Sequence, residues 1–352
     1  MRNKAQRKMW IFLITLVVLG VVLSWSSPAK LSEQTVNSIN ALERVELNGS
    51  KQWISIRGIN TNNPVLLFLH GGPGSANLAL LRQQAPVLEQ HFVVVNWDQR
   101  GAGKSFSPFR KESLTLSGML ADTHALVEYL KNRFGVEKIY LVGFSWGTVL
   151  GLSYAAEHPE NLYAYISVSQ EVNSLEGERI SLAYVQEQAR LRGNQQAQAE
   201  LAGIDPELYT TKEGFKQLQI QRKWLLQYGG VYSSHTSYAH EIRSLLTTRE
   251  YSLFDFALWP LGSSRSLQQL FPEVMKVNFF EQVPQVHVPV YFLAGRHDYN
   301  TPFELVEIYY TQLDAPAGKQ LIWFEDSAHA IMWDEPDLLS QTFIEIEQET
   351  SP

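Results

Sequence analysis

The sequence predicts an α/β fold: a mostly parallel, twisted sheet with helices on both faces and an inserted helical cap. Two observations carry this prediction. Short, nearly continuous apolar runs recur along the chain, as in strands buried on both faces of a parallel sheet, and helix-length segments separate them. The predicted strands are 65–69, 92–95, 139–142, 163–168, 290–294 and 320–324. The predicted helices are 116–134, 146–157, 303–313 and 335–347.

The chain departs from this alternation in two places. Residues 44–57 alternate apolar and polar side chains around an Asn-Gly pair, which is typical of an antiparallel hairpin. Residues 171–284 contain Gln, Glu, Leu and Tyr at helical spacing and no clear strand. Such an insertion predicts a helical cap over the carboxyl ends of the strands, where parallel sheets bind ligands. We therefore expect a core formed by 43–170 and 285–352, with 171–284 as the cap.

The amino-terminal region suggests a membrane segment. Residues 1–8 are basic, and an apolar run without charged residues follows at 9–25. This run is close to the shortest length that spans a bilayer, and the preceding charges would keep residues 1–8 in the cytoplasm. We expect an uncleaved anchor at 9–25 with the main domain outside the cytoplasm, and a polar linker at 26–42. The alternative is a signal segment that is cleaved from a secreted protein.

Composition excludes several classes of function. The 352 residues carry a net charge of −7, which argues against a nucleic-acid partner. The chain has no cysteine, so disulfides, thiolate metal sites and cysteine nucleophiles are excluded. His235 and His240 lack nearby carboxylates with metal-ligand spacing. We expect no metal and no cofactor.

The pattern Gly143-Phe-Ser-Trp-Gly147 lies between a predicted strand and a predicted helix. A G-x-S-x-G pattern in this context forms a sharp turn that exposes the hydroxyl of its serine, here Ser145. Directly after the first parallel strand, His70-Gly-Gly-Pro-Gly74 can fold its backbone toward that serine. We expect the backbone N–H groups of Gly72 and Trp146 to form an oxyanion hole.

The segment Trp97–Ser105 ends in Gly-Lys-Ser, as a phosphate-binding loop does. That loop also requires a glycine five positions before its last glycine, where this chain has Asp98, so a phosphate site is excluded. We expect Asp98 and Arg100 instead to brace the loop beneath the serine.

A nucleophilic serine requires a base and an acid that orients the base. Asp298 and His329 each follow a late predicted strand, and the order Ser145, Asp298, His329 is the order found in α/β-hydrolases. We expect His329 to accept the serine proton and Asp298 to orient it. His297 is the competing histidine and Asp326 the competing acid.

These motifs together resemble those of the α/β-hydrolase superfamily and, within it, the proline iminopeptidase-like serine aminopeptidases. The resemblance covers roughly 44–170 and 285–345, and it implies that Ser145, Asp298 and His329 are nucleophile, acid and base. The family holds the substrate's amino group with cap glutamates, one in a Glu-x-His-Tyr-Phe-like context that does not occur in this chain. The carboxylates available here belong to Glu171, Glu176, Glu178 and Glu241.

We therefore expect a serine hydrolase whose substrate is a small peptide or an ester. The first hypothesis is an aminopeptidase of proline iminopeptidase type, with Glu171, Glu241 and Trp333 as candidate substrate-binding residues. The second is a carboxylic ester hydrolase with the same triad. The third is a non-catalytic ligand-binding domain on a hydrolase scaffold. Epoxide hydrolases and dehalogenases are disfavoured because they carry a carboxylate where this chain has Ser145.

Overall fold

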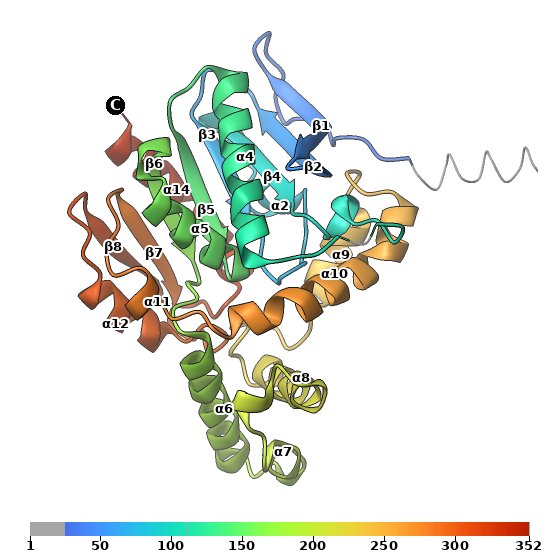
Figure 1. Ribbon diagram of the computed structural model, residues 1–352, viewed down its shortest axis with the longest axis vertical. Coiled ribbons are helices and arrows are strands. Elements are labelled where there is room, and N and C mark those ends of the chain that lie inside the picture. Colours follow the sequence, from blue (N-terminus) through green and yellow to red (C-terminus); the bar gives the residue numbers. More distant parts are fainter. Residues whose placement is uncertain (1–24, 111, 352) are drawn as a thin grey trace, which may run out of the picture.

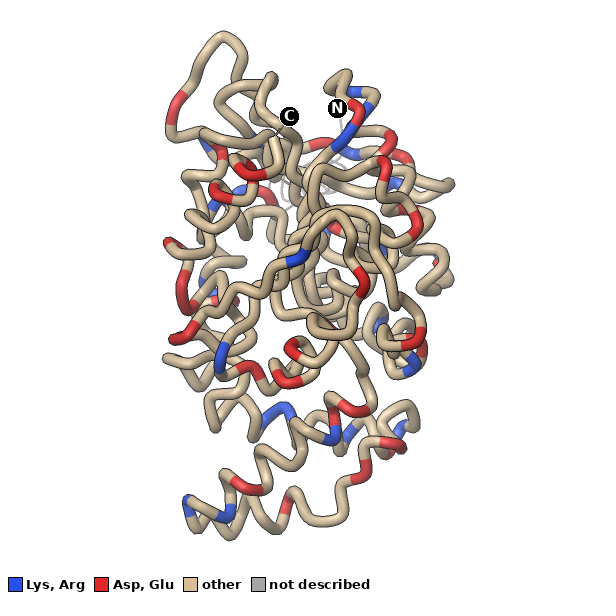
Figure 2. The backbone as a smooth tube through the Cα atoms, turned by 90° about the vertical axis from the view of Figure 1, so that its left-hand side faces the viewer, with Lys and Arg blue, Asp and Glu red and all other residues tan. Residues whose placement is uncertain are grey.

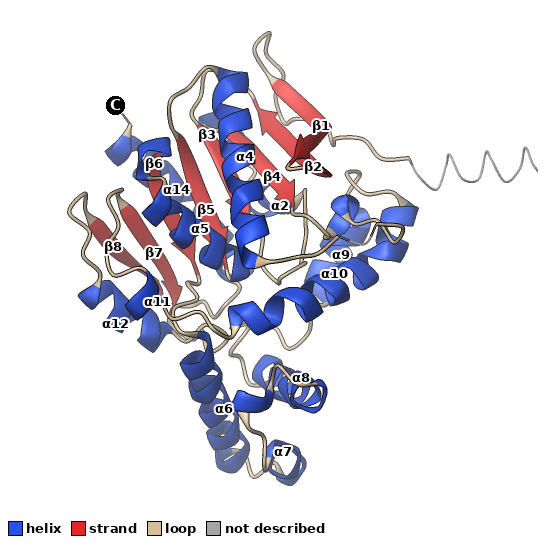
Figure 3. Cartoon of the chain, in the orientation of Figure 1, coloured by secondary structure: helices blue, strands red, loops and turns tan. Residues whose placement is uncertain are grey.

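A computed structural model describes residues 25–110 and 112–351. Its centre is an eight-stranded sheet with the order β1-β2-β4-β3-β5-β6-β7-β8 (Figures 1 and 3). The strands are β1 (Ile39–Leu47), β2 (Ser50–Gly58), β3 (Val65–Leu69), β4 (Val93–Asp98), β5 (Ile139–Phe144), β6 (Leu162–Val168), β7 (Val290–Gly295) and β8 (Lys319–Phe324). β1 pairs antiparallel with β2, β2 pairs antiparallel with β4, and the remaining pairs are parallel. The predicted α/β class and the predicted hairpin are confirmed.

Helices cover both faces of the sheet because the parallel strands are apolar on both sides. One face packs on α4 (Leu116–Phe134), α5 (Trp146–Glu157) and α12 (Phe303–Gln312). The other packs on α2 (Leu80–Gln84), α3 (Leu88–His91) and α14 (Pro336–Thr350). In β3, every residue from Val65 to Leu69 is buried, which explains its uninterrupted apolar sequence.

The insertion between β6 and β7 consists of helices that extend beyond the strand ends in Figure 1. They are α6 (Ser174–Leu191), α7 (Gln195–Leu201), α8 (Lys212–Gln227), α9 (Ala239–Thr247) and α10 (Leu253–Val274), followed by the short α11 (Phe279–Gln282). Polar side chains cap the amino-terminal ends of α6 and α10. Asn173 accepts from the backbone N–H of Glu176, and Ser252 and Asp255 form a capping box. We refer to α6–α10 as the inserted helices.

The segment before the sheet is more ordered than the predicted linker. β1 begins at Ile39, inside the range 26–42. Two residues upstream of β1 are held by the buried Arg57 of β2. Its guanidinium donates to the carbonyl oxygens of Ala29 (2.6 Å) and Lys30 (3.1 Å). Ser27 N donates to Arg249 O at 2.9 Å. These residues therefore join the core to the connection between α9 and α10.

The predicted membrane-anchored location is corrected by the structure. Residues 9–24 of the proposed anchor lie outside the described residues. Among residues 25–110 and 112–351, no helix combines the length and the apolar character that crossing a bilayer requires. In Figure 2, basic and acidic residues are interspersed over the core and the inserted helices.

Candidate active site

Ser145 occupies the sharp turn between β5 and α5. Its backbone has φ 54° and ψ −122°, a strain of about 1–3 kcal/mol for a residue with a Cβ. The turn requires glycine on either side. A Cβ on Gly143 would lie 2.6 Å from the Gly147 carbonyl oxygen, and one on Gly147 would collide with the Leu69 backbone. The turn places Ser145 at the wall of a cavity and at the N-terminus of α5.

His329 lies between Ser145 and Asp298. Its Nε2 is 2.9 Å from Ser145 Oγ, and its Nδ1 is 2.9 Å from Asp298 Oδ2. A carboxylate can only accept, so Nδ1 carries the proton and Nε2 accepts the hydrogen bond from the serine hydroxyl. All three side chains are buried. In this arrangement an imidazole can remove the hydroxyl proton and generate a nucleophile.

Asp298 is itself held by hydrogen bonds from the residues that follow it. Oδ1 accepts from the backbone N–H of Asn300 (2.8 Å) and of Thr301 (2.9 Å), and Oδ2 accepts from the Thr301 hydroxyl (2.8 Å). On the other side, Ser169 Oγ donates to the carbonyl oxygen of His329 at 2.7 Å. These bonds fix the orientation of the acid and of the imidazole before any substrate binds.

The two competing residues lie elsewhere. His297 is exposed, and its backbone N–H pairs with Ser327 O. Asp326 is also exposed, and its backbone N–H donates to a Glu335 carboxylate oxygen at 3.2 Å. Neither side chain is among those that line the cavity at Ser145.

The glycine-rich loop after β3 borders the serine. Gly72 has φ 121°, in the region that favours glycine. Gly71 packs so closely on the turn that a Cβ there would lie 3.2 Å from the Ser145 Cβ. Gly72 and Trp146, the two residues expected to form the oxyanion hole, both line the cavity beside Ser145.

Gln99 joins that loop to the start of α5. Its Nε2 donates to His70 O at 3.1 Å, and its Oε1 accepts from the Trp146 indole N–H at 2.9 Å. Burial lowers the pKa of His70 to about 4, so this imidazole is neutral. Its Nδ1–H donates to Gly71 O (2.8 Å), and its Nε2 accepts from Gln99 N–H (3.3 Å).

Asp98 and Arg100 have separate roles. Asp98 is buried and accepts from Lys104 N–H (2.7 Å) and from the Tyr251 hydroxyl (2.7 Å), so it joins its loop to the inserted helices. Burial raises the pKa of Asp98 to about 7. Arg100 instead forms a two-pronged ion pair with Asp122 on α4, at 2.6 and 2.7 Å. The expectation that Arg100 braces the loop beneath the serine is therefore wrong.

The cavity at Ser145 has a volume of about 860 Å³. It lies between the loops at the strand ends and the helices α8, α9 and α10. Glu171, Glu241 and Trp333, the candidate substrate-binding residues, all line it, together with Ser145 and His329. Most of the other lining side chains are apolar.

Acidic side chains lie in this cavity close to the serine. The backbone N–H of Glu171 donates to Thr148 Oγ1 (2.9 Å), and that hydroxyl donates to Ser145 O (2.6 Å). Burial, reinforced by nearby Glu178, raises the pKa of Glu171 to about 7. Burial also raises the pKa of Glu241, although the Tyr232 hydroxyl donates to its carboxylate.

Glu178 differs from these two carboxylates because it is already neutralised within the chain. It accepts from Arg222 Nη1 at 2.9 Å and from Gln221 Nε2 at 2.9 Å. The Arg222 side chain lines the cavity with it. Glu171 and Glu241 therefore remain available to a cation in the cavity.

A model of the alpha/beta hydrolase fold family matches residues 64–336. This chain belongs to that family. A probable aminopeptidase of Bacillus subtilis (strain 168), YbaC, is 32% identical over 308 residues, which cover 87% of this chain and 95% of the relative. A proline iminopeptidase of Saccharolobus solfataricus is 25% identical over 293 residues, 80% of this chain and 83% of the relative.

The crystal structure of a proline iminopeptidase-related protein from Thermus thermophilus has the same fold. It superposes with a TM-score of 0.64 at 21% identity and covers 89% of this chain and 99% of that chain. The α/β-hydrolase fold and the resemblance to proline iminopeptidases, both predicted from the motifs, are confirmed. The chain is a hydrolase of this family.

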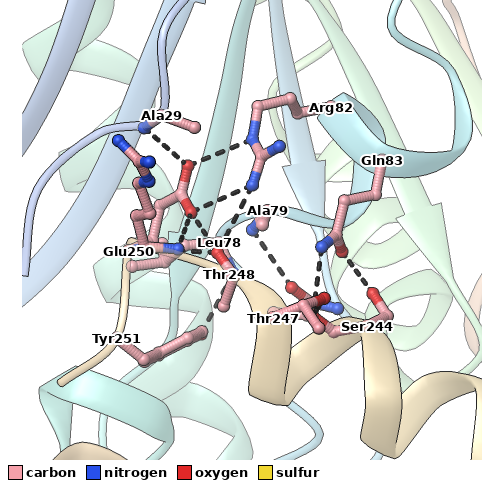
Figure 4. A network of polar contacts seen from close by, with 12 residues as sticks. Ala29, Leu78, Ala79, Arg82, Gln83, Ser244, Thr247, Thr248, Glu250 and Tyr251 are labelled. Atoms are coloured by element: carbon pink, nitrogen blue, oxygen red, sulfur yellow. Dashed lines mark hydrogen bonds and ion pairs between the residues drawn. The ribbon is translucent and has the colours of Figure 1, made fainter.

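A polar network joins α2 to the end of α9 and the connection that follows it (Figure 4). Arg82 of α2 donates to both carboxylate oxygens of Glu250 at 3.1 Å, and Gln83 Nε2 donates to Ser244 O at 3.0 Å. The Tyr251 hydroxyl accepts from Leu78 N–H at 3.0 Å. Glu250 is fully buried. This network anchors the C-terminal end of α9 and the following connection to the core.

Two residues beside this site were not predicted from the sequence. Gln99 lies between the charged residues Asp98 and Arg100, and its position directly after a strand was the available signal. Asn300 follows Asp298 by two positions, and its Nδ2 lies 3.1 Å from Nε2 of His329. A neutral amide carries no motif, so only the folded chain reveals that it contacts the imidazole.

Proposed function

We propose that this hydrolase is a serine aminopeptidase of proline iminopeptidase type that releases amino-terminal residues from short peptides. The observation that supports it is the position of His329, 2.9 Å from both Ser145 Oγ and Asp298 Oδ2. The names of the relatives, a probable aminopeptidase and a proline iminopeptidase, agree with this proposal. In it, residues 171–284 form a cap over the site.

The reaction follows from the hydrogen bonds. Ser145 Oγ attacks the scissile carbonyl carbon while His329 Nε2 takes its proton, and Asp298 stabilises the imidazolium. The N–H groups of Gly72 and Trp146 bind the oxyanion, each contributing roughly 3 kcal/mol to the barrier reduction. The imidazolium then protonates the leaving amine. Water, activated by the same imidazole, hydrolyses the ester bond to Ser145.

The free amino group of the substrate binds Glu171 and Glu241 in this proposal. Both carboxylates lie in the cavity that contains Ser145, and neither forms an ion pair within the described part of the chain. Their burial makes an unpaired negative charge unfavourable, so an ammonium group gains from binding there. Trp333 forms part of the same wall.

The decisive experiment measures hydrolysis of prolyl-, alanyl- and leucyl-4-nitroanilides by the full chain and by Ser145→Ala. We expect turnover by the wild-type protein and a loss of roughly 10⁴-fold or more in the variant. Ser264→Ala, an exposed serine on α10, should match the wild type. A fluorophosphonate probe should label Ser145. Folded protein that is neither labelled nor active would contradict the proposal and favour a non-catalytic binding domain.

The second candidate is a carboxylic ester hydrolase with the same three residues. The largely apolar walls of the cavity favour it, because an acyl chain needs no carboxylate partner. Turnover of 4-nitrophenyl esters without turnover of any aminoacyl-4-nitroanilide, in protein whose Ser145 reacts with the probe, would support this alternative. Faster hydrolysis of the anilides with a free amino group than of their N-acetylated forms would support the aminopeptidase.

A further inference from the structure

Apolar side chains of the inserted helices α8 and α10 form one part of the cavity wall. Leu218 and Phe271 are buried and, with Tyr209, form a cluster separate from the two cores of the sheet. Phe215, Leu267 and Met275 pack against this cluster. All of these side chains except that of Tyr209 line the cavity at Ser145. We call the region lined by Phe215, Leu218, Leu267, Phe271 and Met275 the apolar compartment.

The path of α10 places this compartment next to the glycine-rich loop. A Cβ on Gly74 would lie 2.8 Å from the Ser266 Cβ and 2.9 Å from the Ser263 Cα, so α10 lies directly on this loop. Leu267 follows Ser263 by about one helical turn, and Phe271 follows by about two. The compartment therefore continues along α10 from the loop that carries Gly72.

Polar groups near the compartment bind one another. The Tyr209 hydroxyl donates to Gln221 Oε1, and Gln221 Nε2 donates to Glu178, which also binds Arg222. The rings of Phe215 and Phe271 meet edge to face, with centroids 6.3 Å apart. The five side chains that define the compartment are apolar, so they recognise a group by apolar contact.

The cavity is larger than one small amino-terminal residue of a substrate needs. About 860 Å³ is near the upper end of volumes that enclose ligands of drug size. A proline or alanine bound at Ser145 would leave the compartment open to water. A larger apolar group would fill it and gain the free energy of burial.

We propose that the apolar compartment binds a large apolar group attached next to the scissile carbonyl. In the aminopeptidase this group is the side chain of an amino-terminal Leu, Phe or similar residue, in preference to proline or alanine. The inference deepens the proposed function and rests on it, because it takes Ser145 as the nucleophile and Glu171 and Glu241 as the partners of the substrate's amino group.

The test measures kcat/KM of the full chain for prolyl-, alanyl-, leucyl- and phenylalanyl-4-nitroanilide. One added methylene in an apolar pocket changes selectivity by about tenfold or more, so leucyl and phenylalanyl substrates should exceed alanyl by at least that factor. Equal or better turnover of the prolyl or alanyl substrate would overturn the inference.

Filling the compartment should remove this preference. Leu218→Trp should lower the ratio of phenylalanyl to alanyl turnover by about tenfold. Leu191→Trp is the matched control because Leu191 is 62% exposed and lies at the end of α6, outside the cavity. Met275→Phe provides a second filling variant if Leu218→Trp does not fold, as judged by thermal unfolding and probe labelling. An unchanged ratio in a folded filling variant would overturn the inference.

An ester series separates this inference from the proposed function. If Ser145 reacts with the probe but no anilide is hydrolysed, the aminopeptidase proposal fails. The same variants are then measured on 4-nitrophenyl acetate and hexanoate. A wild-type preference for hexanoate that Leu218→Trp abolishes and Leu191→Trp retains supports the compartment as an acyl site. Equal use of both esters by the wild type would overturn the inference.

Discussion

The strand-end side of the cavity and the α9 side hold their side chains by different means. Ser145, Asp298 and His329 are buried, and each is fixed by backbone geometry or by hydrogen bonds from adjacent strand ends. By contrast, no residue of α9, from Ala239 to Thr247, is fully buried. Yet Glu241, near the start of α9, lines the same cavity.

The position of α9 therefore depends on contacts at its ends. Its C-terminal end is anchored to α2 through Gln83 and Ser244 and through the buried pair of Arg82 and Glu250 (Figure 4). Nearer its other end, the Tyr232 hydroxyl donates to Glu241. The reacting groups are therefore fixed at the strand ends of the sheet, and we expect a change in the position of α9 to leave them in place. The following predictions test this difference.

The largest effect is expected on the strand-end side. Asp298→Asn leaves the hydrogen bonds from the Thr301 backbone possible but cannot select the tautomer of His329 that accepts the serine proton. We expect kcat to fall by about 10⁴-fold with little change in stability. Asp326→Asn, the competing acid, is the control and should remain within about twofold of the wild type. The opposite ranking of the two variants would show that Asp326 is the acid.

An intermediate effect is expected on the α9 side. Arg82→Met leaves Glu250 buried without its cation, which should lower the free energy of unfolding by about 3 kcal/mol. Urea unfolding measures this loss. The control is Arg190→Met, which breaks an exposed pair with Glu187 and should change stability by less than about 1 kcal/mol. Probe labelling of Ser145 should persist in folded Arg82→Met. Loss of labelling would contradict the independence of the two sides.

The smallest effect is expected at Glu171, between the two sides. Because burial raises its pKa to about 7, Glu171 is largely protonated in weak acid and ionised above neutrality. An ammonium substrate gains from the ionised form only. The ratio of kcat/KM for wild type over Glu171→Gln should therefore rise by about tenfold between about pH 5 and about pH 8.

Dividing the wild-type kcat/KM by that of Glu171→Gln removes the pH dependence of the titrating groups that the two proteins share. Glu176→Gln, exposed on α6 and paired with Arg179, serves as the control and should show no such rise. The pH dependence of stability has the opposite sign to that of kcat/KM. A raised carboxyl pKa stabilises the fold below its ordinary value of 4.5, and this contribution is lost as pH rises through about 7. Glu171→Gln should therefore be the more stable protein above neutrality, and a less stable variant there would contradict this assignment.

Local patterns predicted the parts of the fold that depend on local physics. The run at 65–69 is buried on both faces, as its composition indicated, and 116–134 forms α4 over the same residues. The turn at Ser145 was predictable because only glycine fits at 143 and 147. The partner of Arg100 was not, because Asp122 lies on a helix whose packing against the hairpin the motif does not encode.

From its sequence alone, this chain was predictable as an α/β hydrolase with Ser145, Asp298 and His329 as candidate residues. Strand composition and glycine positions are constraints that act within a few residues. The tertiary structure decided which side chains meet at long range: Asn300 with His329, Gln99 with Trp146, and α8 with α10 around the apolar compartment. Such contacts depend on how helices pack over the sheet, and side chains of the same type could have satisfied other packings equally well.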